Sequence, residues 1–189
     1  MIEEKVIKYF FRKAEIGEWE HLTIKEAEKK LKVRSSKIKE LFIEKEYFLI
    51  FYLSFIDKKV LLSVTKEDFD ISKPEEILQE YLMNKFEYMN QYKLAISNIV
   101  NFYIRNPNFL LIFLKSNKNS IEKLLKQFSI SNNVLKKKIL TKSILTIWLL
   151  AFKKWLYESD ENSSSFAILD KGFKRLKKST NLLDILLKE

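Results

Sequence analysis

The 189-residue sequence has no cysteine, one histidine, two glycines and two prolines. Without cysteine the chain has no disulfides and no thiolate metal ligands, and His21 alone cannot supply a zinc site or a histidine-dependent catalytic triad. No phosphate-binding loop or nucleophile–base pair accompanies the acidic residues. Glycine and proline dominate tight turns, and their scarcity favours long helices. We predict an all-α protein that is not an enzyme and has no metal site and no cofactor.

Long apolar runs are also missing. The two longest, YFLIFYLSFI (47–56) and SILTIWLLAF (143–152), have ten residues each, whereas a helix needs about 20 to span a bilayer. The N-terminus, MIEEKVIKYFFRK, has early acids and no small-residue cleavage site, which is unlike a signal peptide. We therefore expect a cytoplasmic protein with no membrane span.

The charge balance is strongly basic, with a formal net charge of +10. Such a balance favours anionic partners such as nucleic acid or a lipid headgroup surface. Nearly all the basic residues are lysine, and codon bias in an AT-rich genome is a second explanation for so many lysines. The distribution of charge along the sequence is therefore more informative than the total charge. Residues 25–39 hold seven bases against two acids, and residues 115–142 hold eight lysines against Glu122. Both regions are candidate anion-binding surfaces.

Two short helices with a tight junction are predicted after a first amphipathic helix that ends near Gly17, a residue suited to a left-handed stop. Thr23 and Glu26 have the spacing of a capping box, in which each side chain bonds to the other residue's backbone N–H. After the junction, Ser35 or Ser36 can cap the next helix. This is the helix-turn-helix pattern, although many small helical bundles contain a similar corner.

The remainder is predicted to be helical with polar breaks at 65–76 and 158–165, and with a short helix at 121–128 that leads into a Ser–Asn loop at 129–132. The segment from Ile144 to Phe152 is apolar nearly all round, which is typical of a helix buried by its own core and by a partner subunit. We therefore predict a homodimer through residues 139–157 and 163–180.

Several segments resemble the TetR family of bacterial transcriptional regulators. At the N-terminus these are LTIKEAEKKLKV, SSKIKELF and EKEYF, and in the C-terminal half EYLMNKFEYMNQYKLAI and LLAFKKWLYESDENSSSFAILDKGFKRL. The residues that match positions typical of the family are Thr23, Val33, Phe42, Lys45, Glu46, Trp155, Leu169 and Asp170. The residues that depart from the family pattern are Glu28, Lys32, Lys39 and Leu41, of which Lys32 replaces the glycine of the turn.

The resemblance implies a three-helix helix-turn-helix DNA-binding domain at residues 1–48 and a helical effector-binding and dimerisation domain at 49–189. Such a protein is a homodimeric repressor that binds a pseudo-palindromic operator in double-stranded DNA and is released by a small apolar ligand. The C-terminal tail also resembles the TetR-fold lipid-binding accessory proteins of ubiquinone biosynthesis, which implies the alternative that the chain binds lipid and does not read DNA.

Candidate site residues follow from these patterns. The candidates for DNA contact are Thr23, Arg34, Ser35, Ser36, Lys37, Lys39 and Lys45. The candidates for lining an effector pocket, because such pockets are mostly apolar, are Met83, Phe86, Met89, Phe102, Phe109 and Phe113. Helix capping, a solvated helix face and ordinary core packing are the competing explanations for single members of both sets.

Overall fold

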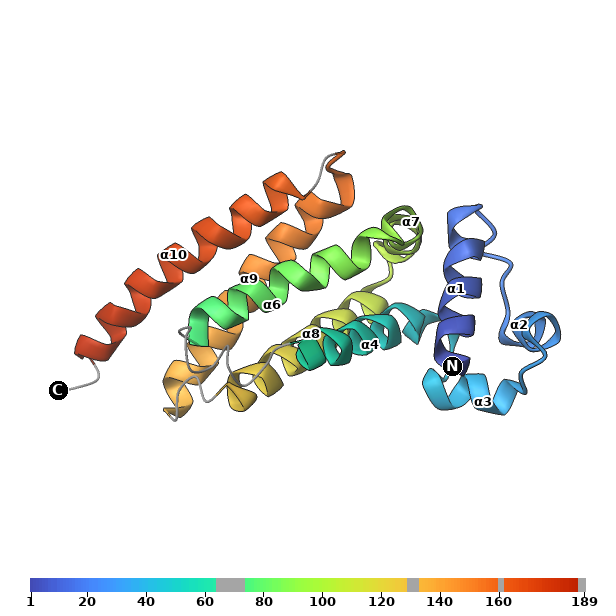
Figure 1. Ribbon diagram of the computed structural model, residues 1–189, viewed down its shortest axis with the longest axis horizontal. Coiled ribbons are helices and arrows are strands. Elements are labelled where there is room, and N and C mark those ends of the chain that lie inside the picture. Colours follow the sequence, from blue (N-terminus) through green and yellow to red (C-terminus); the bar gives the residue numbers. More distant parts are fainter. Residues whose placement is uncertain (64–73, 129–132, 160–161, 187–189) are drawn as a thin grey trace. The chain divides into compact units, whose positions relative to one another are not determined.

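The structure is a computed structural model that describes residues 1–63, 74–128, 133–159 and 162–186. The regular elements of these residues are α1 (Ile2–Glu15), α2 (Ile24–Leu31), α3 (Ser35–Leu41), the 3-10 helix η1 (Lys45–Tyr47), α4 (Phe48–Ser63), α6 (Pro74–Asn90), α7 (Lys93–Tyr103), α8 (Pro107–Gln127), α9 (Val134–Tyr157) and α10 (Ser163–Leu186) (Figure 1). The predicted all-α fold class is confirmed. The predicted loop at 129–132, most of the break at 65–76 and part of the break at 158–165 lie outside the described residues.

Neither a membrane-spanning helix nor a metal-binding group occurs among these same described residues. None of their helices combines the length and the apolarity needed to cross a membrane. Within those ranges no group of three or more His, Cys, Asp or Glu side chains is arranged to hold a metal ion.

The internal contacts divide the chain into two compact units. Unit 1 comprises Met1–Ile56 and Met89–Phe113, and unit 2 comprises Asp57–Tyr88 and Leu114–Glu189. The helices α4, α6 and α8 each continue from one unit into the other. The domain boundary predicted after residue 48 falls at the start of α4 and stays a prediction.

Unit 1 has an aromatic core beneath α1. Phe10 of α1 is fully buried, stacks on Phe48 with ring centroids 4.9 Å apart, and meets Phe42 edge-to-face at 5.1 Å. Trp19, from the turn after α1, lies 5.7 Å from Phe48. The turn itself begins at Gly17, whose φ of +79° is the left-handed stop predicted for the first helix. These contacts hold the residues before α2 and after α3 on one core.

Unit 2 has a second aromatic core between α6 and α9. Phe86 of α6 lies 6.5 Å from Trp148 and 5.7 Å from Trp155, and Phe152 stacks on Trp148 at 4.9 Å. All four side chains are at most 4% exposed. The buried side of the apolar segment in α9 therefore packs within its own unit.

The helices α9 and α10 lie side by side as an antiparallel pair (Figure 1). Ser165, in the first turn of α10, donates from its hydroxyl and from its backbone N–H to the two carboxylate oxygens of Glu158, which fixes the connection. A Cβ added at Gly172 of α10 would lie 2.7 Å from Cγ2 of Ile147 of α9, so the two helices approach each other closely at that glycine.

The helix α8 differs from the sequence prediction, which placed a separate short helix at 121–128. It runs unbroken from Pro107 to Gln127. The polar residues that suggested a break are partly on its inner face. Asn117 is only 4% exposed, and the Ser120 hydroxyl donates to Asp57 Oδ2 at 2.6 Å. Polar side chains in the buried stripe concealed the helical period.

Candidate nucleic-acid interface

A turn of three residues, 32–34, joins α2 to α3, and these two helices pack against each other in unit 1. Lys32 has φ 53° and ψ 39°, which is the left-handed region. A residue with a Cβ pays on the order of 1 kcal/mol there relative to glycine. The corner therefore has the left-handed turn residue expected of a helix-turn-helix, even though lysine stands at that position.

The start of α2 was predicted to be a capping box, and half of it forms. Thr23 Oγ1 accepts a hydrogen bond from the Glu26 backbone N–H at 3.1 Å. The Glu26 carboxylate instead accepts from the Tyr9 hydroxyl at 3.0 Å and pairs with Lys13 Nζ at 2.9 Å. Lys13 and Tyr9 together lower the pKa of Glu26. Glu26 thus ties α2 to α1, and this long-range link replaces the local one.

The start of α3 also differs from the prediction. The residue at the N-cap is Arg34, whose side chain makes no capping hydrogen bond. Ser35 and Ser36 are the first two residues of the helix, and the prediction that either caps it was wrong. A capping oxygen must come from the residue before the first turn to reach the free N–H groups. The Ser36 side chain is exposed at this helix start.

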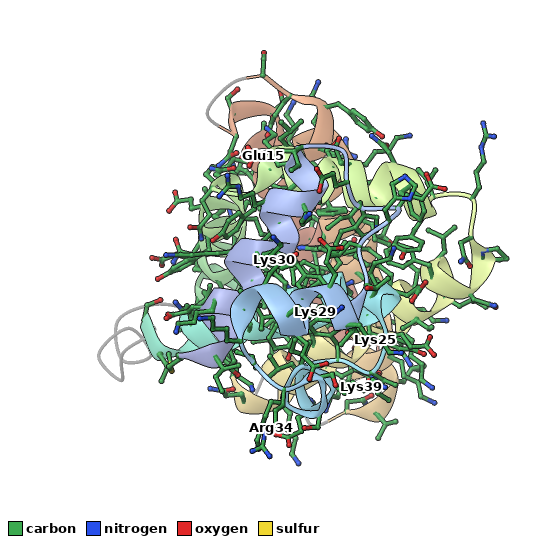
Figure 2. All side chains as sticks on the ribbon, turned by 90° about the vertical axis from the view of Figure 1, so that its right-hand side faces the viewer. Glu15, Lys25, Lys29, Lys30, Arg34 and Lys39 are labelled. Carbon is green, nitrogen blue, oxygen red and sulfur yellow. The ribbon has the colours of Figure 1, made fainter. Side chains whose placement is uncertain are left out.

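Basic side chains gather on the exposed surface of these two helices. We define the basic surface by its six residues, all exposed: Lys25, Lys29, Lys30, Arg34, Lys37 and Lys39. Figure 2 shows Lys25, Lys29 and Lys30 on α2, Lys39 on α3 and Arg34 in the turn between the two helices. Ile38, fully buried, anchors α3 on the opposite side. The six cations produce a positive field over the corner.

Three members of the basic surface were absent from the predicted site, although their charge had been counted. Lys25 and Lys29 are four residues apart and flank the buried Ala27 by two positions on either side, which puts both on the face of α2 opposite Ala27. Lys30, also exposed, follows Lys29 by about 100° around the helix. The spacing from Ala27 is the sequence signal that could have identified the pair.

Lys37 is the one member of the basic surface that forms an ion pair among the contacts resolved there. Its Nζ lies 3.0 Å from both carboxylate oxygens of Glu40, one helical turn later. The side chains are 46% and 60% exposed, respectively. An exposed pair of this kind contributes at most about 1 kcal/mol to stability. Its main effect is to place a carboxylate among the cations of α3.

Lys45 lies in η1 and is held by the protein itself. Its Nζ donates to the backbone carbonyls of Trp19 at 2.8 Å and Glu20 at 2.9 Å. The same atom lies 5.6 Å from the centre of the Trp19 ring and 5.9 Å from that of Phe102. Burial lowers the pKa of Lys45. One of its three N–H groups remains for a further acceptor.

The six residues proposed for an effector pocket belong to both units. Met83 and Phe86 are in unit 2, and Met89, Phe102, Phe109 and Phe113 are in unit 1. Within unit 1, Phe109 stacks on Phe113 at 5.9 Å, and both are buried. Phe102 is 48% exposed, and its ring meets Tyr103 edge-to-face. A pocket shared by the six stays a prediction.

The rival basic region, residues 115–142, belongs to unit 2 and is distributed over α8 and α9. Lys118 pairs with Glu122 at 3.4 Å on α8. Lys136, Lys137 and Lys138 are the third to fifth residues of α9, and Asn133 Oδ1 accepts from the Lys136 backbone N–H at 3.0 Å at the start of this helix. The lysines of this region therefore lie on two long helices, whereas those of unit 1 lie on two short helices and the turn between them.

Comparison with known proteins gives a structural likeness only. The sequence matches no protein-family model and is not significantly similar to any curated protein. Among solved structures, the chain is similar to a TetR transcriptional regulator from Nitrosomonas europaea ATCC 19718, with a TM-score of 0.72 and 13% sequence identity. The match covers 92% of this chain and 97% of that protein. The chain therefore has the TetR fold.

Proposed function

We propose that the chain is a cytoplasmic DNA-binding transcriptional regulator of TetR type. The observation that carries the proposal is the left-handed turn at Lys32 between α2 and α3, in the same corner as the basic surface. In a helix-turn-helix the second helix enters the major groove while the first crosses the backbone. The cations of α2 then neutralise phosphates, and α3 meets base edges.

The candidate residues take separate roles in this complex. Lys39 and Lys37 flank the outer face of α3, within reach of base edges or phosphates. The hydroxyls of Thr23, Ser35 and Ser36 and the guanidinium of Arg34 are donors for phosphate oxygens at the helix starts. Lys45 contributes its remaining N–H, and the lysines of α2 add sequence-independent attraction.

A charge-matched comparison tests this assignment. The triple variant Lys29→Ala, Lys37→Ala and Lys39→Ala and the control Lys136→Ala, Lys137→Ala and Lys138→Ala each remove three positive charges. Binding to a fluorescent duplex of random sequence is measured by anisotropy at several salt concentrations. We expect the first variant to lose affinity and to lower the salt slope by about 0.9 for each phosphate contact removed. We expect the control to bind like wild type. A loss confined to the control would place the anion-binding surface on α8 and α9.

We further propose a homodimer through α9 and α10. These helices border an open groove of about 590 Å³, lined mainly by apolar groups from both of them. Leu150, in its lining, is 55% exposed, and Ile147 and Ile168 lie in the same groove. A second copy of the same helix pair, related by a two-fold axis, would cover these side chains and build a four-helix bundle. A dimer also supplies the two α3 helices that a pseudo-palindromic operator requires.

Sedimentation of a matched pair of variants tests the dimer. Leu150→Glu puts a charge into the groove, and Leu111→Glu puts the same charge on another exposed leucine, 67% exposed on α8 in unit 1. We expect wild type and Leu111→Glu to sediment as dimers at micromolar concentration and Leu150→Glu as a monomer. A wild-type monomer would refute the proposal.

For the effector we propose a small apolar ligand that releases the protein from DNA. The proposal rests on the resemblance of the sequence to the TetR family and on the apolar character of the six candidate residues, because ligand sites of this type are mostly apolar. Small apolar compounds are screened for those that raise the melting temperature and weaken DNA binding together. A compound that raises the melting temperature and leaves DNA affinity unchanged would not be the effector.

A lipid-binding protein that does not read DNA is the second candidate, favoured by the same open apolar groove. If lipid occupies it, protein purified from cells should carry lipid detectable by mass spectrometry, and Leu150→Glu should lose that lipid while remaining in the wild-type oligomeric state. Sequence-independent or absent DNA binding would accompany this result.

A further inference from the structure

The outer face of α3 has a carboxylate at its centre. Ile38 is fully buried and marks the inner side of the helix. At about 100° of rotation per residue, Ser36 and Glu40 lie about 200° from Ile38 in opposite directions, and both point outward. Lys37 and Lys39 lie about 100° to either side of Ile38, at the flanks. The residues that a nucleic acid would meet first are therefore one small hydroxyl and one acid.

The acid forms an ion pair with a neighbouring lysine. Lys37 Nζ holds both oxygens of Glu40 at 3.0 Å, and the Glu40 side chain is nevertheless 60% exposed. Ser36, one turn before Glu40, adds little bulk on the same ridge and allows close approach of a partner. A carboxylate that faces a phosphodiester backbone is repelled, and it becomes favourable only where it meets a hydrogen-bond donor.

We propose that Glu40 is the specificity-determining residue of α3 and that it selects a cytosine in the major groove. This inference rests on the proposed DNA-binding function. An ionised carboxylate only accepts hydrogen bonds, and the cytosine N4 amino group is the donor that glutamate reads there. Guanine O6 and N7 and thymine O4 are acceptors and leave the carboxylate unpaired, and adenine places its N7 acceptor beside its N6 donor, where it repels a carboxylate. Lys37, which already touches Glu40, is a donor for O6 or N7 of a guanine in the same or the adjacent base pair.

Two roles of the carboxylate follow from its charge. The carboxylate raises the affinity for sequences with one particular base at its position. It lowers the affinity for every other sequence, because it opposes the positive field of the basic surface. Glu40→Ala should therefore bind random DNA more tightly than wild type and should lose preference at one position of each half-site. Loss of one good base contact corresponds to a fall of about 5- to 150-fold in discrimination at that position.

Glu40→Gln gives a different signature. The amide group can pair with adenine N6 and N7, and the preference at the same position should move from cytosine toward adenine. Glu15→Gln is the matched control because it removes the same charge from an exposed residue of α1, which also belongs to unit 1. Glu40 is exposed, and its variants should melt close to the wild-type temperature.

The experiment is selection and sequencing of duplexes bound from a random pool by full-length wild type, Glu40→Ala, Glu40→Gln and Glu15→Gln. We expect wild type and Glu15→Gln to enrich one motif that contains the cytosine, and the two Glu40 variants to change that position only. If all four proteins enrich the same motif with the same base ratios, Glu40 does not read the sequence, while the proposed function stands. If wild type enriches no sequence, the proposed function and this inference both fail.

Discussion

The buried ion pair of unit 2 gives the sharpest stability prediction. Asp57 Oδ1 of α4 accepts from Lys85 Nζ at 2.6 Å and from the Tyr81 hydroxyl at 2.8 Å, both on α6. Its Oδ2 accepts from the Ser120 hydroxyl of α8 at 2.6 Å. Lys85 is 3% exposed, and its Nζ lies 5.3 Å from the centre of the Trp148 ring. Three helices therefore meet at one carboxylate, whose side chain is 16% exposed.

Removing one partner leaves the other charge buried without compensation. We expect Lys85→Met to destabilise the protein by about 3–5 kcal/mol, because methionine occupies the space of the lysine stem but leaves the Asp57 carboxylate with hydroxyl donors alone. Asp57→Asn should lower the free energy of unfolding by a similar amount, because it leaves the Lys85 ammonium without its negatively charged partner. For a chain of this size each kcal/mol lowers the melting temperature by roughly 2–4 °C, which predicts a fall of about 6–20 °C for each single variant.

The double variant Asp57→Asn with Lys85→Met decides the mechanism. It removes both charges, and the asparagine carbonyl can still accept from Tyr81. We expect the double variant to be more stable than either single variant, which requires a coupling free energy of about 3 kcal/mol or more by urea unfolding. Additive losses, or a loss below about 1 kcal/mol for Lys85→Met, would refute the account of a buried pair.

Three further predictions concern single positions. Lys32→Gly should raise stability by up to about 1 kcal/mol, because glycine has no Cβ penalty in the left-handed region, and a lower urea midpoint would contradict this. Gly172→Ala should lower the free energy of unfolding by about 1–3 kcal/mol, measured as a lower urea midpoint, because the new Cβ meets the branched Ile147 at 2.7 Å and this outweighs alanine's better helix propensity. A higher midpoint would mean that α10 shifts freely. Lys45→Met should lower the melting temperature through its two lost carbonyl contacts, and lower the salt slope of DNA binding by about one unit. An unchanged slope would assign Lys45 to the fold alone.

Local signals predicted the N-terminal helices well. Gly17 ends the first helix region in the left-handed conformation, and Thr23 caps α2, as their residue types predict. Lys32 adopts a backbone conformation that its own side chain disfavours. Its position between two helices anchored by Ala27 and Ile38 determines that conformation. The conformational penalty of about 1 kcal/mol at Lys32 is small compared with the free energy gained when the apolar side chains of those two helices are buried on one core.

The interactions that the sequence could not predict are long-range. Glu26 has the spacing of a capping-box residue, but Lys13 and Tyr9 of α1 offer it a cation and a hydroxyl, and a charged partner competes better than a second backbone N–H. The same limit applies to the candidate site. The sequence places Lys45 beside the basic residues, whereas its hydrogen bonds to carbonyls some 25 residues earlier depend on the packing of Trp19.

The helix α8 illustrates why a search for apolar periodicity fails at a buried polar cluster. Its inner face includes Asn117, Ser120, Ile121 and Leu124, whose spacings of three, one and three residues are helical, but only the last two are apolar. Ser120 belongs inside because Asp57 of α4 needs a donor for its second oxygen. That need arises from Asp57, which lies 63 positions away in the sequence. A polar residue at a helical spacing therefore argues for a loop only when no buried charge elsewhere in the chain requires a partner.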